Sequence, residues 1–169
     1  MRSGLWLRLD HVARSLWPFA LTVALVILSQ VPLRITLLSP VLPSLALIAV
    51  YYWSIHRPDL MPIWAVFLIG LFQDLLGGGP AGVGILTLLA VHAVVTAQRR
   101  FFASASFVVI WLVFALVALA AQALAWLLVS ALAGAVVEPR PATFQILLTI
   151  AVYPCLAWGF AQAQRAIVH

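Results

Sequence analysis

The sequence predicts an all-α polytopic membrane protein with about six transmembrane helices in one compact bundle. Hydrophobic residues make up 66% of the 169 residues, charged residues make up only 8%, and the mean hydropathy is +1.17. A soluble domain is about half apolar and about a quarter charged, so this chain would present too much apolar surface to water. We therefore expect a single transmembrane domain over residues 1–169, surrounded by lipid.

The first three spans are expected at residues 17–37, 41–55 and 62–76. A helix needs about 20 apolar residues to cross a bilayer. The first run follows three arginines, but it is long and no small-residue cleavage site follows it, so we interpret it as a span and not as a signal peptide. The second run is short, and the third has a proline in its first turn, where the missing N–H does no harm. The alternative is that the second and third runs form one broken or re-entrant unit, which leaves four or five true spans.

The last three spans are expected at residues 82–98, 106–135 and 143–164. The fifth is long enough to tilt or to protrude from the bilayer. The sixth contains Pro154, which predicts a kink because proline removes a helical hydrogen bond.

The arginines indicate how the spans are oriented. The chain has nine arginines, no lysine and a net charge of +5. Six spans place seven of these arginines on one side of the membrane, and an odd number of spans would scatter them: Arg2, Arg8, Arg14, Arg57, Arg99, Arg100 and Arg165. Positive loops stay in the cytoplasm, so we expect both termini there. No basic stripe with interleaved aromatic residues is present, so we expect membrane lipid as a partner and no nucleic acid.

The stretch "GLFQDLLGGGPAGVG", residues 70–84, contains Asp74, one of four acidic residues in the chain. Three glycines and Pro80 follow it, and they predict a sharp non-helical reversal whose free N–H groups need acceptors. We expect Asp74 to accept them and to hold this outer hairpin together. The alternative is an ion pair with Arg34, which the predicted topology places at a similar depth.

Other polar groups inside the predicted spans are few. His92 is expected to be a neutral histidine hydrogen-bonded inside the bundle, and Gln73 and Gln122 are expected to form hydrogen bonds between helices. Cys155 is the only cysteine, which excludes an intrachain disulfide and a paired-cysteine metal site. Because no set of residues has catalytic or metal-ligand spacing, we expect no enzyme activity, no metal and no cofactor.

The stretch "YYWSIHRPDLMP", residues 51–62, has two interpretations. The first is a belt of interfacial aromatic residues followed by a tight cytoplasmic turn. The second is a docking surface for a partner, with His56, Arg57 and Pro58 as the candidate residues.

These two stretches, followed by "QRRFF", together resemble the MreD family of rod-shape-determining membrane proteins. In that family an aromatic-rich span, a His-Arg-Pro turn and a Gly-x-x-x-Asp-x-x-x-Gly-x-x-Gly segment recur in this order. Here the last segment is Gly70, Asp74, Gly78 and Gly82. The specific part of the resemblance covers about residues 41–102.

The resemblance implies a scaffold or regulator in the bacterial inner membrane. MreD-like proteins act beside MreC, the actin-like MreB, RodA and a penicillin-binding transpeptidase, and they help to couple filaments to peptidoglycan synthesis. We therefore expect an MreC-like single-span protein as the direct partner and the others as indirect partners. The family has also been likened to the substrate-binding subunits of energy-coupling-factor transporters, which implies an outward cavity near Asp74. A small-molecule or lipid-binding transport subunit is accordingly the alternative function.

Overall fold

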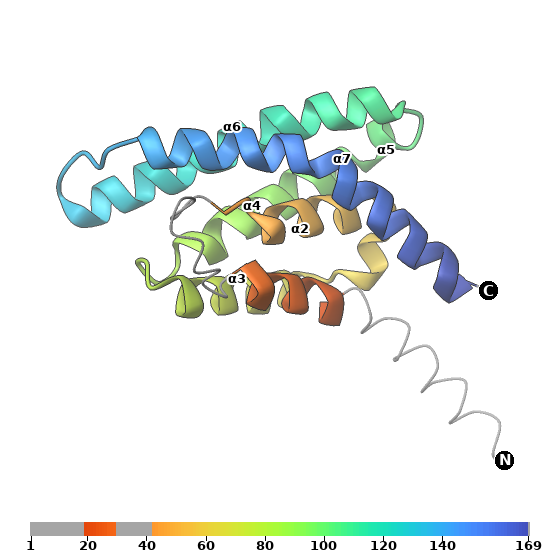
Figure 1. Cartoon of the computed structure of the whole chain (residues 1–169), viewed down its shortest axis with the longest axis horizontal. Coiled ribbons are helices and arrows are strands. Elements are labelled where there is room, and N and C mark those ends of the chain that lie inside the picture. Colours follow the sequence, from red (N-terminus) through yellow and green to blue (C-terminus); the bar gives the residue numbers. More distant parts are fainter. Residues whose placement is uncertain (1–18, 30–41, 169) are drawn as a thin grey trace, which may run out of the picture.

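The computed structural model describes residues 19–29 and 42–168, and all regular structure in these ranges is helical. An unlabelled helix, Phe19–Ser29, comes first. The labelled elements then follow in chain order: α2 (Leu45–His56), the 3-10 helix η1 (Pro58–Leu60), α3 (Ile63–Gly77), α4 (Val83–Ala97), α5 (Arg99–Phe102), α6 (Phe107–Ala133) and α7 (Arg140–Val168). α6 and α7 run side by side along one side of the molecule, and α3 lies on the opposite side (Figure 1).

The helix ends follow the proline and glycine residues of the sequence. α3 begins directly after Pro62, and it ends at Gly78, whose φ of 65° is left-handed. α4 begins after Gly82, whose φ is 102°. Because L side chains resist these angles, glycine is required at both ends of the α3–α4 loop.

The observed helices agree closely with most of the predicted runs. The third, fourth and fifth predicted segments match α3, α4 and α6 to within two residues at each end. α7 is longer than predicted and continues through Pro154. α2 begins at Leu45 and not near residue 41, because Pro43 and Ser44 precede it in non-helical conformation. The first predicted span includes the helix Phe19–Ser29, and its other residues lie outside the described ranges.

The helix lengths differ from those of six full spans. α2 has 12 residues and α3 and α4 have 15 each, which gives lengths of about 18 Å and about 22 Å against a hydrocarbon core of about 30 Å. Among the described residues, only α6 and the part of α7 from Arg140 to Ala163 are long and apolar enough to cross a membrane. Pro43 lies two residues before α2 and Pro58 lies two residues after it, and these prolines keep the helix short.

The outward surface of α6 is apolar. Only Phe114, Ala118 and Ala121 of its 27 residues are buried. Leucines project outward along its whole length, among them Leu112, Leu116 and Leu127. Water would penalise so much exposed apolar area, whereas lipid does not. The surface therefore fits a protein that sits in a bilayer.

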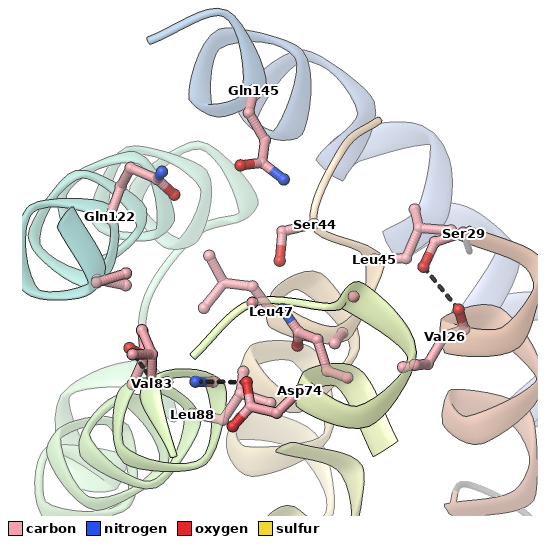
Figure 2. A pocket seen from close by; sticks show the side chains of 18 of the residues that line it. Val26, Ser29, Ser44, Leu45, Leu47, Asp74, Val83, Leu88, Gln122 and Gln145 are labelled. Atoms are coloured by element: carbon pink, nitrogen blue, oxygen red, sulfur yellow. Dashed lines mark hydrogen bonds between the residues drawn. The ribbon is translucent and has the colours of Figure 1, made fainter. Parts of the chain in front are cut away.

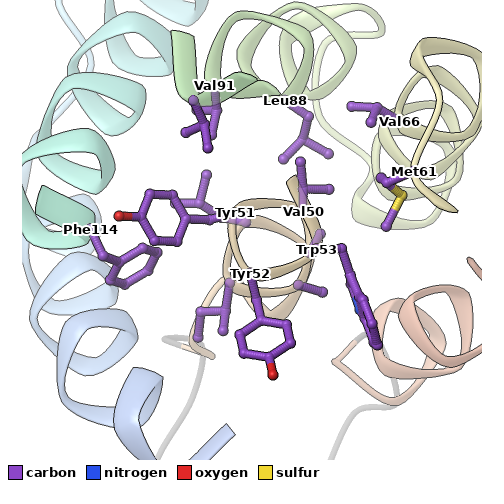
Figure 3. Close-up of a cluster of buried hydrophobic side chains, with 14 of the residues drawn as sticks. Val50, Tyr51, Tyr52, Trp53, Met61, Val66, Leu88, Val91 and Phe114 are labelled. Carbon is purple, nitrogen blue, oxygen red and sulfur yellow. The ribbon is translucent and has the colours of Figure 1, made fainter. Parts of the chain in front are cut away.

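α2 forms the centre of the bundle. Nine of its 12 residues are buried, and it contacts α3, α4 and α7. Figure 3 shows Tyr51 and Trp53 leaving α2 in different directions, Tyr51 toward Phe114 of α6 and Trp53 on the side of α2 where Met61 lies. Tyr51, Tyr52 and Trp53 are at most 3% exposed. The interpretation of these aromatic residues as an interfacial belt is therefore wrong: they pack the core.

The aromatic cluster ties α2 to the last two helices. The Phe114 and Tyr153 rings stack with their centroids 4.2 Å apart, and the Tyr51 ring lies 5.0 Å from the Phe114 ring. The Tyr51 hydroxyl donates to the Ile110 carbonyl oxygen at 2.9 Å, so its polar end is satisfied within the core.

The two ends of the bundle differ in charge. One end carries η1, α5 and the C-terminal part of α7, and thus the segments around Arg57, Arg99, Arg100 and Arg165 (Figure 1). The other end carries the α3–α4 loop and the α6–α7 loop, where Arg140 forms an ion pair with Glu138 at 3.2 Å. The fold thus gathers these four predicted same-side arginines at one end.

Candidate functional site

Asp74 lies in the last turn of α3 and binds the beginning of α4. Its Oδ1 accepts a hydrogen bond from the Gly84 N–H at 2.8 Å. Its Oδ2 accepts hydrogen bonds from the N–H groups of Gly82, at 2.8 Å, and Ile85, at 3.3 Å. The first N–H groups of a helix have no partner within the helix and carry partial positive charge, so a carboxylate stabilises them strongly. Asp74 therefore caps α4 from a neighbouring helix.

This arrangement confirms one part of the expectation and corrects another. Asp74 does accept backbone N–H groups and does join the two arms of the hairpin. The donors, however, are Gly82, Gly84 and Ile85, and not the three glycines that follow Asp74 directly. The expected alternative partner, Arg34, lies outside the described residues, so that ion pair stays a prediction.

Two glycines allow α3 and α4 to approach this closely. A Cβ built on Gly70 would lie 2.7 Å from the Ile85 Cα, and a Cβ on Gly84 would collide with Asp74 Oδ1. Real Cβ atoms do not approach other atoms so closely, so any side chain at these positions requires a shift. Gly84 is absent from the family pattern quoted above and was missed as a site residue. The only signal for it was its place in the glycine-rich stretch.

A cavity of about 470 Å³ lies beside the Asp74 cap. Figure 2 shows Gln122 of α6 and Gln145 of α7 on one side and Asp74 on the other, with Leu47 of α2 between them. The walls also include Pro80 of the loop and Ser44 before α2. A cavity near Asp74 agrees with the expectation, but the contributions of Ser44 and Gln145 are not apparent from the sequence pattern.

The glutamines of this cavity do not bridge helices as expected. Gln73 Oε1 is buried and has no hydrogen-bond partner among the described residues. Gln122 likewise forms no hydrogen bond with the part of the chain that the structure describes, whereas Gln145 Nε2 donates to the Leu42 carbonyl at 3.2 Å. Among the described residues, the cavity thus has an unused acceptor and an unused amide beside a carboxylate that already accepts three backbone donors.

His92 is buried in α4 and binds Ser54 of α2, as expected for a histidine hydrogen-bonded inside the bundle. The distance from His92 Nδ1 to Ser54 Oγ is 2.8 Å, and the side chains of both residues are buried. The Ser54 hydroxyl also donates to the Val50 carbonyl at 2.6 Å. Because a hydroxyl has one proton, the His92 Nδ1–H group is the donor in the bond with Ser54.

The His-Arg-Pro turn lies at the opposite end of the bundle from Asp74 (Figure 1). His56 stacks on Tyr52 with ring centroids 4.2 Å apart, and its Nδ1 donates to the Tyr52 carbonyl at 3.0 Å. Arg57 is exposed, and Pro58 begins η1. The candidate residues thus form two groups: His56, Arg57 and Pro58 at one end, and Gly70, Asp74, Gly78, Pro80 and Gly82 around the α3–α4 hairpin.

The described residues contain no group of three or more His, Cys, Asp or Glu side chains placed to hold a metal ion. Cys155 is exposed on α7. The hairpin site binds backbone donors of α4 and lines the cavity beside it, which is a structural role.

Comparison with known proteins identifies the family. No curated protein and no solved structure matches the chain significantly, so the expected likeness to transporter substrate-binding subunits stays a prediction. The family model described as rod shape-determining protein MreD matches residues 11–160, which is nearly the whole chain. This match covers the Gly70–Asp74–Gly78–Gly82 segment and the bundle built around it, and the chain therefore belongs to the MreD family of rod shape-determining proteins.

Proposed function

We propose that this MreD-family protein is a non-enzymatic scaffold that binds an MreC-like single-span protein in the bacterial inner membrane. The observation that carries the proposal is the family match over residues 11–160, which assigns the chain to rod-shape determination. Through that partner, the scaffold acts on MreB filaments, RodA and a penicillin-binding transpeptidase, and so helps to couple the filaments to peptidoglycan synthesis.

The topology proposed with this function places both termini in the cytoplasm. The segments that contain Arg57, Arg99, Arg100 and Arg165 lie at one end of the bundle (Figure 1). Positively charged loops are retained on the cytoplasmic side, which supports this end as the inner one. The α3–α4 hairpin with Asp74 then faces the periplasm, where the stem of an MreC-like partner begins.

The partner's transmembrane helix needs an apolar helix face, and α6 offers one. Its outward residues Leu112, Leu116 and Leu119 recur at helical spacing and are at least 52% exposed. Lipid tails are as apolar as these leucines, so binding here depends on shape complementarity between helix surfaces. A bulky substitution on this face should therefore weaken the complex without unfolding the protein.

The test combines co-purification with cell shape. Leu116→Trp on α6 should reduce recovery of a tagged MreC-like partner and should round up rod-shaped cells when it replaces the wild-type copy. Leu75→Trp on α3 is the matched control, because both leucines are 67% exposed. Equal recovery with both variants would reject the α6 face. Rod shape that persists after depletion of the protein would reject the function itself.

The second candidate function is a small-molecule or lipid-binding subunit. The observation that favours it is the cavity of about 470 Å³, where Gln73 Oε1 has no hydrogen-bond partner among the described residues. A ligand that binds the folded state raises its melting temperature. A ligand screen that finds such a shift in wild type, and a smaller shift in Gln122→Leu, would support this candidate; a screen without shifts would count against it.

A further inference from the structure

Another cavity lies at the arginine-rich end of the bundle, and its lining is basic. It is a groove of about 540 Å³, and its lining includes Ile55 and His56 of α2, Arg99, Arg100 and Phe102 of α5, and Ile110 of α6. We name it the basic groove. Three of these six residues are basic, and no acidic residue is among the described residues that line the groove.

The arginines of the basic groove are free to bind an anion. Arg99 and Arg100 are exposed, and within the described ranges no carboxylate lies within ion-pair distance of either guanidinium group. Arg140 differs from them, because Glu138 already neutralises it at 3.2 Å. Two adjacent unpaired guanidinium groups in a chain with so few charges produce a local positive potential.

The floor of the basic groove is apolar and held in place. Phe102 is 5% exposed, and the edge of its ring packs against Tyr51, with centroids 6.1 Å apart. The Tyr51 hydroxyl fixes the neighbouring turn of α6 through the Ile110 carbonyl. These contacts anchor α5 against α2 and α6, so the basic groove is shaped by the core.

Exposed apolar side chains flank the residues of the basic groove in the sequence. Phe101 of α5 directly follows Arg100, and Phe107 and Val108 begin α6; they are 54%, 52% and 58% exposed. Aromatic and aliphatic side chains in this position contact acyl chains at the membrane interface. An occupant that reaches both kinds of side chain combines an anionic group for the arginines with apolar chains for these neighbouring residues.

We propose that the basic groove binds the phosphate headgroup of an anionic phospholipid. Guanidinium groups bind phosphate and carboxylate oxygens through paired hydrogen bonds, and in a membrane the phosphate of a lipid is the anion that also carries apolar chains. Basic pockets between helices at the cytoplasmic side of a membrane recognise anionic headgroups in this way. The inference rests on the membrane setting and on the topology proposed above, and it does not require the scaffold to bind a partner.

The test compares two lipids that differ only in the headgroup. Purified protein in a neutral detergent is titrated with phosphatidylglycerol or with phosphatidylcholine of the same acyl chains, and the melting temperature is followed. We expect a larger rise with phosphatidylglycerol. Arg99→Gln/Arg100→Gln should lower the apparent affinity for phosphatidylglycerol about 30-fold and remove the preference. Arg140→Gln, at the other end of the bundle, should retain it.

Two further measurements distinguish a lipid phosphate from free phosphate, and the charge of the arginines from their paired hydrogen bonds. Inorganic phosphate should not reproduce the shift; if it does so fully, the groove is a free-anion site and the lipid assignment is wrong. Arg99→Lys/Arg100→Lys should retain part of the preference, because the charge remains while the paired geometry is lost. The proposal would be overturned if both lipids raised the melting temperature of the wild type equally, or if Arg140→Gln lost the preference for phosphatidylglycerol to the same extent. An acidic segment of a protein would then be the occupant to test next.

Discussion

Asp74 Oδ1 lies 2.8 Å from the backbone nitrogen of Gly84, and this contact exists only because Gly84 has no side chain. The carboxylate belongs to α3 and the N–H group to α4, so one hydrogen bond joins the two arms of the hairpin. Asp74 and Gly84, ten residues apart, thus form one structural contact between the two helices.

Asp74→Asn should lower the stability of the protein. An amide keeps one oxygen acceptor, but its NH2 group then faces backbone N–H donors that need an acceptor. Hydrogen bonds to charged groups contribute about 1.5–3 kcal/mol, so we expect a loss of about that size in the free energy of unfolding. Thermal unfolding in detergent measures it. Asp59→Asn is the control, since Asp59 is exposed and forms no hydrogen bond or ion pair with the described residues.

Arg34→Gln should partly rescue Asp74→Asn if these two residues form the ion pair that the sequence suggests. Loss of one charge leaves the other unpaired in an apolar setting, and removal of both relieves that cost. A double-mutant cycle on the unfolding midpoint gives the coupling energy. Strictly additive effects would reject the ion pair and leave the backbone cap as the function of Asp74.

Gly70→Ala and Gly84→Ala should both destabilise the hairpin. The new methyl group at position 70 meets the Ile85 backbone, and the one at position 84 meets the Asp74 carboxylate. Gly159→Ala is the control, because a Cβ there meets nothing within 4 Å. Alanine is the better helix former by about 1 kcal/mol, so Gly159→Ala should be neutral or stabilising. Equal melting temperatures for all three variants would contradict the close contact between α3 and α4 at Gly70 and Gly84.

Ser54→Ala and His92→Leu should be energetically coupled. Ser54→Ala leaves the His92 Nδ1–H group buried without an acceptor, and this cost disappears when His92 is already leucine. We expect a coupling energy of about 1 kcal/mol or more from chemical or thermal unfolding. Thr87→Val supplies the comparison, because the Thr87 hydroxyl bonds only its own helix at the Val83 carbonyl. Its effect should add to that of His92→Leu without coupling.

Single cysteines should label from opposite sides of the membrane. Cys155 is exposed, so the experiment starts from Cys155→Ala. An impermeant maleimide added to intact spheroplasts should modify Gly79→Cys, and it should modify Ala103→Cys only after permeabilisation. The reverse pattern would overturn the proposed topology, with the α3–α4 hairpin inside and the basic groove outside.

The sequence predicts the helices of this fold better than it predicts their contacts. The bounds of α3 are foreseeable because Pro62 and Gly78 act locally on the backbone. The burial of Tyr52 is not foreseeable in this way, because it depends on Phe160 of α7, whose ring lies 5.1 Å away. The sequence alone does not distinguish an aromatic residue that contacts lipid headgroups from one that packs against another helix, because both occur near helix ends.

At the candidate site, too, some residues are predictable from the sequence and others are not. Asp74 stands out in the sequence because a carboxylate is rare in an apolar chain and needs a partner there. Gly84 does not stand out, because its role comes from the crossing of α3 over α4. The cavity beside them is built from segments as distant as Ser44 and Gln145, and no local pattern connects those positions.

The short central helix α2 has a consequence for the order in which the protein is made. With 12 residues, α2 is too short to cross a bilayer alone. It also packs against α7, and the N–H group of Ser44, the residue before α2, donates to Thr149 Oγ1 of α7 at 3.0 Å. Ser44 and Thr149 are separated by 105 positions, so α2 leaves the ribosome well before α7 has been synthesised. The contact between Ser44 and α7 can therefore form only after the last helix has been synthesised, so this part of the bundle closes late.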